Sequence, residues 1–542
     1  MILGIIFDFD NTLYDYEYTN MMGLNLLFKS ISLDHNVSIN NIEKLYKNIN
    51  KFIKQSNNSS SKFNKDIYIK KLLEELNISL EYLEKYINIY NDEFNNNLKI
   101  YDNVLELFIL LKKNNIKIGI LSNNIFIQQY KKLKVMNLLE YVDIIQTTDE
   151  CGEEKPNIIP FLTIINKINL SRENIAYIGD NYEHDIIPSL NLKMLPFYFI
   201  KNSFFRIVNN YIEFGNYKEL IIFFENYFKT INELIFLSKY FGQSVLNIQG
   251  PGGNISVKMY DLIFIKSSGA VLANVTYNEG YCIANNNKCN ELLVNKQELE
   301  LKNTKIFGYK IPSMETFFHS FMKKYTVHIH FTLSNIFLCS KNKMNLVNFK
   351  YNYEIIEYIP PGLLLAEKIK EKYSIETDIY FLANHGIIIT NNNIEEIIVI
   401  YEYLYSYFNS LFDNKFIDEY NSFLINKNYY FNNSKSYVIR FLTYPYEIIE
   451  KIKYCFPDLA IFIENIKIID DINDLYKDNK FYNIIILNKK VYLCAENLTR
   501  IYYLNELLDK YKILCDYSYD NLIKINDTHF LQNMEQEKYR KL

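Results

Sequence analysis

The stretch Ile2–Asp15, ILGIIFDFDNTLYD, decides the fold of the first part of the chain. A short apolar run from Ile2 to Phe7 is followed at once by Asp8 and Asp10. Such a run predicts a buried parallel strand, and open α/β sheets place their sites beyond the carboxyl ends of their strands. The D-x-D-x-T pattern alone is weak evidence, because acidic residues after a strand are common in loops. The stretch therefore raises the hypothesis of a two-carboxylate site at a sheet edge.

Three later segments extend this pattern. IKIGILSNN (116–124) is a second apolar strand, GEEKPNIIPF (152–161) carries a lysine before a proline that favours a helix start, and IAYIGDNYEHDI (175–186) is a third strand. A strand-end hydroxyl, a lysine and a strand-end acid, in this order after D-x-D-x-T, point to phosphate chemistry. The polar residues that these segments offer are Ser122, Asn123, Lys155, Asp180 and Asp185.

In this order the residues resemble the four motifs of haloacid dehalogenase-superfamily phosphatases, over residues 1–205. The resemblance implies a Rossmann-like α/β core, and the helical patterning of residues 14 to about 99 predicts an α-helical cap that selects the substrate. It implies that Asp8 is the nucleophile that forms an aspartyl-phosphate. Asp10 would protonate the leaving oxygen and then activate water. Asp10 favours a phosphatase over a dehalogenase, because a dehalogenase has no leaving oxygen that needs a proton.

The same resemblance implies a Mg²⁺ site, because this hard cation suits oxygen ligands. The ligands would be Asp8, Asp180 and the backbone carbonyl of Asp10, with Asp185 supporting the metal. The phosphoryl oxygens would be bound by Ser122, Asn123 and Lys155.

The second half of the chain carries a different set of motifs. IQGPGGNISVK (248–258) is a glycine-rich turn before a strand, FIKSSGAVLANV (264–275) is a strand with two serines at its end, and PSMETFFHSFM (312–322) begins a helix. Glycines let the backbone approach closely, and turn amides with hydroxyl groups can bind an anion. The polar residues of these segments are Asn254, Ser256, Ser267, Ser268, Ser313 and Glu315.

Three of the 7 histidines of the chain suggest a metal site. KYTVHIHFTLSN (324–335) alternates at period two, which places His328 and His330 on one face of an expected strand. FLANHGIIIT (381–390) puts His385 between an apolar strand and a glycine. An H-x-H pair with one distant histidine suits a three-nitrogen site with an open position, as catalytic zinc sites have.

The order of these pieces, with Pro-Pro-Gly at 360–362, resembles the class II aldolase/adducin family, and most closely its long rhamnulose-phosphate aldolase type. The tail pattern of that type matches FPDLAIFI (456–463) and the terminal MEQEKYRKL (534–542). The resemblance implies an α/β aldolase domain over 230–428 and a C-terminal α/β extension over 429–542, after a linker at 206–229.

This second resemblance implies that Zn²⁺ is held by His328, His330 and His385. Glu315 would move the proton while a carbon–carbon bond of a phosphorylated ketose is made or broken through an enediolate. The substrate phosphate would be bound by Asn254, Ser256, Ser267, Ser268 and Ser313. His319 is at least as well explained by local packing.

Three functions stay open at this point. The first is a bifunctional phosphosugar enzyme, in which a phosphatase is fused to an aldolase. The second keeps the fold of the second half but makes it a sugar-phosphate epimerase or a dehydratase. The third is a non-catalytic, adducin-like binding module, which the retained histidines and Glu315 argue against. The resemblance also predicts a homo-oligomer, and the substrates would be small phosphorylated sugars.

The composition excludes several classes of protein. The formal net charge is −4, which gives no basic footprint for nucleic acid. The 7 cysteines form no C-x-x-C pair, which is typical of reduced thiols in a cytosolic compartment. The start of the chain has no basic region and contains two acids within ten residues, unlike a signal peptide. No long apolar run predicts a membrane span. We therefore expect a cytoplasmic protein that binds neither nucleic acid nor membranes.

Overall fold

The chain divides into two compact units, Met1–Asn226 and Tyr227–Leu542, which are described separately. The computed structural model describes residues 2–56, 60–208, 210–308, 310–341, 346–411, 429–432, 437–442, 446–463, 465–470, 482–487, 489–495, 498–526, 528 and 531. The terminal motif at 534–542 is part of the resemblance to rhamnulose-phosphate aldolases. It lies outside the described residues.

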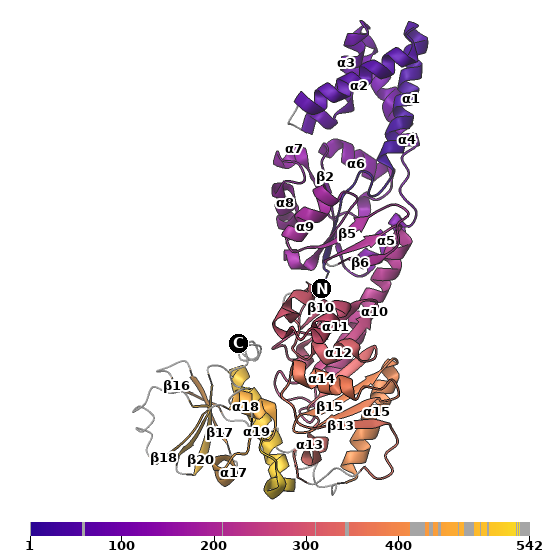
Figure 1. The fold of residues 1–542 in the computed structure, drawn as a ribbon. Coiled ribbons are helices and arrows are strands. Elements are labelled where there is room, and N and C mark those ends of the chain that lie inside the picture. The colour runs from indigo at the N-terminus through magenta and orange to yellow at the C-terminus, as the bar shows by residue number, and fades with distance from the viewer. Residues whose placement is uncertain are drawn as a thin grey trace. The chain divides into compact units, whose positions relative to one another are not determined.

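The first unit is built on a seven-stranded sheet in the order β3-β2-β1-β4-β5-β7-β6, drawn in indigo to magenta in Figure 1. All neighbouring strands are parallel except β6 and β7. The first strand lies in the middle of the sheet, and all four of its residues are buried. The strands are β1 (Gly4–Phe7), β2 (Lys117–Ser122), β3 (Ile144–Thr147), β4 (Ile175–Gly179), β5 (Leu195–Phe199), β6 (Arg206–Val208) and β7 (Tyr211–Phe214).

Helices pack against this sheet through their apolar faces. Phe161 and Ile164 of α8 form one core cluster with Ile6 and Tyr177 from the sheet. The helix that was predicted to start at the proline after Lys155 begins at Ile158, because the Asn157 side chain caps it by accepting from the Ile159 N–H. The core helices are α5 (Val104–Lys113), α6 (Phe126–Val135), α7 (Thr148–Cys151), α8 (Ile158–Ile168) and α9 (Ile187–Asn191).

A helical cap is inserted between β1 and α5, as the sequence predicts. Its longest helix starts after Asp15, whose side chain accepts from the Tyr18 N–H, and ends at Asn36 in the left-handed conformation. The first cap helix packs against the fourth, and the second against the third. The cap helices are α1 (Tyr16–His35), α2 (Ile39–Ser56), α3 (Lys65–Glu75) and α4 (Leu83–Asn96).

The segment 206–229, predicted as a linker, has regular structure, so that prediction is wrong. Its strands β6 and β7 pair with each other, and β7 also pairs with β5. It continues into the helix α10 (Tyr217–Gly242), where the Tyr217 hydroxyl donates to the Thr12 carbonyl at 2.5 Å. Strands of three and four residues are too short to show a period-two pattern, which is why the sequence did not predict them.

The second unit contains an eight-stranded sheet in the order β11-β10-β9-β8-β12-β15-β14-β13. The pairing is antiparallel except between β13 and β14. The strands are β8 (Asn254–Met259), β9 (Leu262–Lys266), β10 (Tyr281–Asn285), β11 (Lys305–Phe307), β12 (Tyr325–Ile329), β13 (Tyr353–Ile356), β14 (Ile379–Leu382) and β15 (Gly386–Asn391).

Helices on this sheet enclose its core. Phe317 and Phe318 of α12 pack in one buried cluster with Tyr380 and Ile388 of the sheet. These aromatic and branched side chains remove a large apolar area from water, which is the main source of stability in such a layer. The helices are α11 (Asn286–Val294), α12 (Thr316–Phe321), α13 (Thr332–Leu338), α14 (Leu363–Glu371) and α15 (Ile394–Asn409).

The described residues of the predicted C-terminal extension form both strands and helices. Its five-stranded sheet has the order β16-β17-β20-β19-β18. The helix α19 contacts α13 of the aldolase-like part, and α18 contacts α19. The elements are β16 (Tyr429–Asn432), β17 (Tyr437–Leu442), α17 (Tyr446–Glu450), α18 (Pro457–Phe462), β18 (Ile466–Ile469), β19 (Ile484–Leu487), β20 (Lys490–Ala495) and α19 (Leu498–Ser518).

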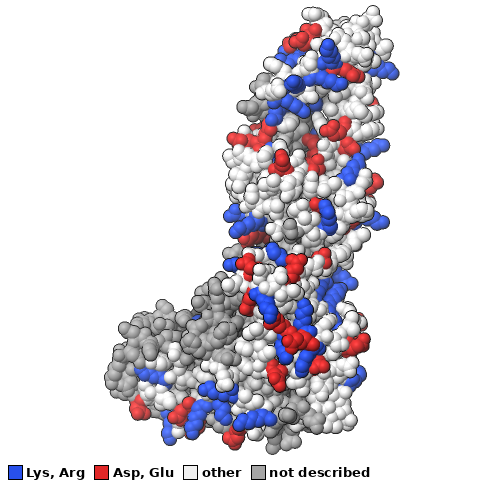
Figure 2. All heavy atoms as spheres, in the orientation of Figure 1, with Lys and Arg blue, Asp and Glu red and all other residues white. Residues whose placement is uncertain are grey.

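The distribution of surface charge and the state of the cysteines fit the net charge and the cysteine spacing of the sequence. On the face drawn in Figure 2, acidic and basic side chains are interspersed, without a large patch of one sign. All seven cysteines are free, and all except Cys151 are buried. Within the described part of the chain, no helix combines the length and the apolar character needed to cross a membrane.

Candidate active sites

The strand ends of the first unit bring three aspartates together. Asp8 follows β1 and Asp180 follows β4, and the Asp8 N–H donates to the Ile178 carbonyl at 2.8 Å. Asp185 lies in the short segment Tyr182–Ile186. One carboxylate oxygen from each aspartate lies within 4.8 Å of the others. The parallel pairing of β1 with β4 therefore gathers the side chains that were predicted to hold magnesium.

Lys155 is the cation within this cluster. Its side chain is 4% exposed, and its Nζ lies 2.5 Å from Asp8 Oδ1 and 2.6 Å from Asp185 Oδ1. The Asn123 side chain holds the lysine backbone: its Oδ1 accepts from the Lys155 N–H at 2.8 Å, and its Nδ2 donates to the Lys155 carbonyl at 3.0 Å. Asn123, expected to contact phosphate, is thus placed where it orients the lysine.

The electrostatics of this cluster favour a further cation. Burial raises the pKa of Asp8 well above its usual range; Lys155 opposes this, while the carboxylates of Asp185 and Asp180 add to it. Burial alone would lower the pKa of Lys155, but Asp185 and Asp8 hold that pKa well above its ordinary value. Three carboxylates therefore share one ammonium group. Because carboxylate oxygens are the donors that Mg²⁺ takes, the residues present fit that ion.

The carboxylate of Asp10 is held by donors on both of its oxygens. Oδ1 accepts from the Tyr14 hydroxyl at 2.5 Å and from Lys132 Nζ at 2.8 Å, and Oδ2 accepts from Gln129 Nε2 at 2.9 Å. Burial would raise the pKa of Asp10, but Lys132 and these hydrogen bonds hold it below its ordinary value. The Lys132 ammonium lies 5.4–5.7 Å from the ring centroids of Phe9, Tyr14, Tyr16 and Phe94.

Two hydroxyl groups complete the first site. Ser122, at the end of β2, is buried, and its Oγ accepts from Gln129 Nε2 at 2.6 Å. Thr12 donates to Asp8 Oδ2 at 2.9 Å and to Asp180 Oδ1 at 3.2 Å. Sequence reasoning did not assign Thr12, Gln129 or Lys132. The available signal was the spacing of Gln129 and Lys132, which places them on one face of α6.

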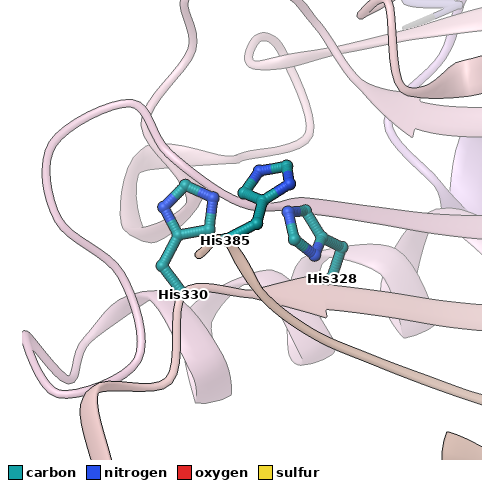
Figure 3. Close-up of side chains that lie close together, drawn as sticks. All are labelled: His328, His330 and His385. Carbon is teal, nitrogen blue, oxygen red and sulfur yellow. The ribbon is translucent and has the colours of Figure 1, made fainter. Parts of the chain in front are cut away.

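Three histidines lie close together in the second unit. His328 lies in β12, His330 directly follows that strand, and His385 lies between β14 and β15 (Figure 3). One ring nitrogen from each histidine lies within 4.8 Å of the others, and the ring centroids are 4.8–5.1 Å apart. The antiparallel pairing of β12 with β15 sets this register, with His328 opposite Ile388.

Each histidine has a defined environment. His328 Nδ1 lies 3.0 Å from the Ile387 carbonyl oxygen, and its Nε2 lies 3.3 Å from Glu315 Oε1. His385 Nε2 lies 3.6 Å from the same glutamate oxygen. His330 Nδ1 lies 2.7 Å from Asp458 Oδ2. Within the described residues, the buried His385 Nδ1 has no hydrogen-bond partner.

The protonation states of the side chains in this cluster suit a divalent metal ion. Burial lowers the pKa of His330 to about 4 and holds the pKa of His385 well below its ordinary value, so both rings are neutral at pH 7. Burial would raise the pKa of Glu315, but His328 and Asn254 hold it well below the usual range. Neutral imidazoles beside a carboxylate are the donors that Zn²⁺ takes, so the residues present fit that ion.

A cavity opens on this cluster. Asn254, Ser268 and Ser313 line it together with His330, His385 and Glu315. The Asn254 amide donates to Ser313 Oγ at 2.6 Å and to Glu315 Oε2 at 2.8 Å. Gly253 and Gly269, also in the lining, have φ of +67° and +70°, values that favour glycine.

Two predicted phosphate contacts lie away from this cavity. Ser256 is fully buried, and its Oγ lies 2.8 Å from His319 Nδ1, because α12 covers β8 beyond its first residue. Ser267 is also buried, and its hydroxyl lies against the thiol of Cys282. Ser268 lies in the turn that follows β9 and lines the cavity, whereas Ser267 does not.

Comparison with known proteins identifies both halves. Residues 5–195 match the family model of haloacid dehalogenase-like hydrolases. Residues 232–409 match the model of the class II aldolase and adducin N-terminal domain. The chain therefore joins a domain of the first family to a domain of the second. These matches confirm the predicted family resemblances and the prediction that the chain is an enzyme with a hydrolase half and an aldolase half.

Individual relatives are phosphatases. A glyceraldehyde 3-phosphate phosphatase of Methanocaldococcus jannaschii is 26% identical over 204 residues, which are 38% of this chain and 87% of the relative. A ribulose-1,5-bisphosphate 5-phosphatase of Halopiger xanaduensis is 24% identical over 194 residues, which are 34% of this chain and 80% of the relative.

Solved structures resemble each half. A phosphatase of the haloacid dehalogenase type from Thermococcus onnurineus is 21% identical, with 41% of this chain and 97% of that chain covered and a TM-score of 0.32. The N-terminal class II aldolase domain of a protein from Thermoplasma acidophilum is 22% identical, with 33% and 92% covered and a TM-score of 0.30.

Proposed function

We propose that the chain is a bifunctional phosphosugar enzyme, with a Mg²⁺-dependent phosphatase in the first unit and a Zn²⁺-dependent aldolase in the second. The observation that supports this most is the presence of two buried donor clusters of different chemistry. One cluster has three carboxylates around a lysine, and the other has three histidines beside a glutamate. Each cluster lies in its own unit.

In the phosphatase half, Asp8 is the nucleophile. Thr12 and Lys155 contact its two carboxylate oxygens, which fixes the carboxylate for attack on the phosphorus of a phosphate monoester. The attack forms an aspartyl-phosphate while the bond between phosphorus and the sugar oxygen breaks. Mg²⁺, when bound by Asp8, Asp180 and the Asp10 carbonyl with Asp185 nearby, supplies positive charge against the phosphoryl oxygens.

Asp10 moves the protons of this reaction. It gives a proton to the leaving sugar oxygen and takes one from the water that hydrolyses the aspartyl-phosphate. The ion pair with Lys132 favours its ionised form, which suits the second of these roles. Ser122, beside Gln129, would bind the phosphoryl group together with Lys155. The named relatives act on glyceraldehyde 3-phosphate and ribulose 1,5-bisphosphate, which supports small phosphorylated sugars as substrates.

In the aldolase half, Glu315 is the proton-transfer group. Asn254 donates to one of its oxygens, the other oxygen faces His328 and His385, and the glutamate lines the cavity. The ionised glutamate takes or gives a proton at the carbon next to the substrate carbonyl. Zn²⁺, when bound by His328, His330 and His385, supplies a Lewis acid that stabilises negative charge on that substrate.

The substrate phosphate would bind in the same cavity of the aldolase half. The hydroxyl groups of Ser268 and Ser313 offer hydrogen bonds there, Asn254 orients Ser313 through its amide, and Gly253 and Gly269 leave room for an anion to approach the backbone. These contacts would hold a phosphorylated ketose with its carbonyl toward the histidines.

The test uses each centre as the control for the other. Wild type, Asp8→Asn and His328→Ala are incubated with phosphorylated ketoses, and inorganic phosphate and aldehyde are measured separately. We expect Asp8→Asn to lose phosphate release only, and His328→Ala to lose aldehyde release only. If an epimerised sugar forms and no aldehyde is released, the second unit is an epimerase and not an aldolase. No turnover by wild type at either centre would refute the proposal.

A further inference from the structure

The C-terminal extension reaches the predicted zinc site through α18 and α19, which lie side by side (Figure 1). Pro457, the first residue of α18, lines the cavity together with His330 and His385. All six residues of α18 are buried, so this short helix is fixed in place by its packing. The extension therefore contributes directly to the wall of the site.

We propose, on the basis of the aldolase function above, that Asp458 of the extension is the positioning residue of His330 and completes the zinc site. Its Oδ2 lies 2.7 Å from His330 Nδ1, and the two side chains are 2% and 5% exposed. A carboxylate this close to Nδ1 favours a proton on that nitrogen, which leaves Nε2 as the lone-pair nitrogen. Asp458 thus selects the tautomer and fixes the plane of the ring.

The extension also forms hydrogen bonds with the chain segments that carry two of the histidines. Lys510 of α19 donates from Nζ to the His330 carbonyl at 3.1 Å and to Gln249 Oε1 at 3.2 Å. Asn384, the residue before His385, donates to the Cys455 carbonyl at 2.8 Å. Two of the three histidine segments are therefore tied to the extension, whereas His328 Nδ1 faces the Ile387 carbonyl within the aldolase sheet.

Gly252, in the glycine-rich turn before β8, lies directly against the contact between His330 and Asp458. A Cβ at Gly252 would lie 2.8 Å from His330 Nδ1 and 3.0 Å from Asp458 Oδ2. Real Cβ atoms essentially never lie under 3.0 Å from a neighbour, so a side chain here forces the His330 ring to shift beside Asp458. The absence of a side chain at position 252 therefore allows the two groups to meet.

The test measures zinc affinity by competition with a chelator in the full-length protein. Asp458→Asn keeps the shape and removes the charge, and we expect it to weaken zinc binding about 10–100-fold. Asp458→Ala, which also removes the acceptor, should weaken it more. The matched control is Asp516→Asn, an aspartate 43% exposed on α19 of the same extension, which should bind zinc as wild type does.

A second variant keeps the test valid if the Asp458 variants fold poorly. Gly252→Ala leaves both charges in place and displaces the His330 ring beside Asp458, so it should also weaken zinc binding at least tenfold. The absorption bands of the Co²⁺-loaded protein should shift in Asp458→Asn and Gly252→Ala but not in Asp516→Asn. Hydrogen exchange of the β8 and β12 amides reports on intact folding of the second unit.

The possible outcomes separate this inference from the proposed function. Wild-type protein that binds no zinc would overturn the aldolase proposal itself. Wild-type protein that binds zinc, with Asp458→Asn and Gly252→Ala equally tight and spectroscopically unchanged, would overturn the role of Asp458 alone.

Discussion

Replacing Lys155 by methionine should destabilise the first unit strongly. The lysine is buried, and its Nζ lies 2.5 Å from Asp8 Oδ1 and 2.6 Å from Asp185 Oδ1. Removing one partner of a buried ion pair costs about 3–5 kcal/mol, because the remaining charge is left uncompensated. Here two carboxylates lose their cation, so the cost should fall in this range.

Hydrogen exchange measures this cost for each unit separately. Amides of β1 and β4 exchange through opening of the first unit, and amides of β8 and β12 serve as an internal control in the second. A loss of about 3–5 kcal/mol should accelerate exchange in β1 and β4 roughly a hundred- to several-thousand-fold, since 1.36 kcal/mol corresponds to a factor of ten. Exchange in β8 and β12 should not change.

A double variant shows whether uncompensated charge is the cause. Asp185→Asn removes one of the two stranded carboxylates, so Lys155→Met/Asp185→Asn should recover about 0.5–3 kcal/mol relative to Lys155→Met. Acceleration of less than tenfold in Lys155→Met, or no recovery in the double variant, would refute the argument.

Three further perturbations test other parts of the two sites. Lys132→Met removes the ion pair that lowers the pKa of Asp10, so the limb of the phosphatase pH profile that belongs to Asp10 should move to higher pH. Glu315→Gln should keep bound zinc in metal analysis but lose about 10²–10⁴-fold in aldehyde release, because the proton-transfer group is gone. Burial lowers the pKa of Lys258 to about 7, so the unfolded chain binds this proton more tightly and stability should rise with pH above about 7. In wild type, the unfolding midpoint should therefore rise between pH 7 and pH 8.5. In Lys258→Met, which lacks the titrating amine, this part of the rise should be absent.

The sequence predicts those parts of the sites that depend on short segments. Asp8, Ser122 and Asp180 each follow an apolar run, and parallel strands deliver their ends to one edge of a sheet. His328 and His330 are two residues apart at the end of one strand, so their shared face follows from the period of a strand alone. The structure brings these residues together where the sequence places them.

The parts that the sequence did not predict depend on contacts between distant segments. Asp458 meets His330 across 128 positions of the chain, and no local pattern marks such a pair. Lys132 and Gln129 reach Asp10 from a helix more than a hundred residues away. Ser256 fits the expected pattern, but α12 covers it, and only the packing of the helix decides that.

The most direct test of the two-centre account is the metal content of the full-length protein, measured by mass spectrometry of the elements after purification without chelators. The account predicts one zinc ion per chain in wild type and in Asp8→Asn, and none in His328→Ala, which should still release phosphate when Mg²⁺ is added. Wild-type protein that takes up no zinc, or His328→Ala protein that retains it, would contradict the account.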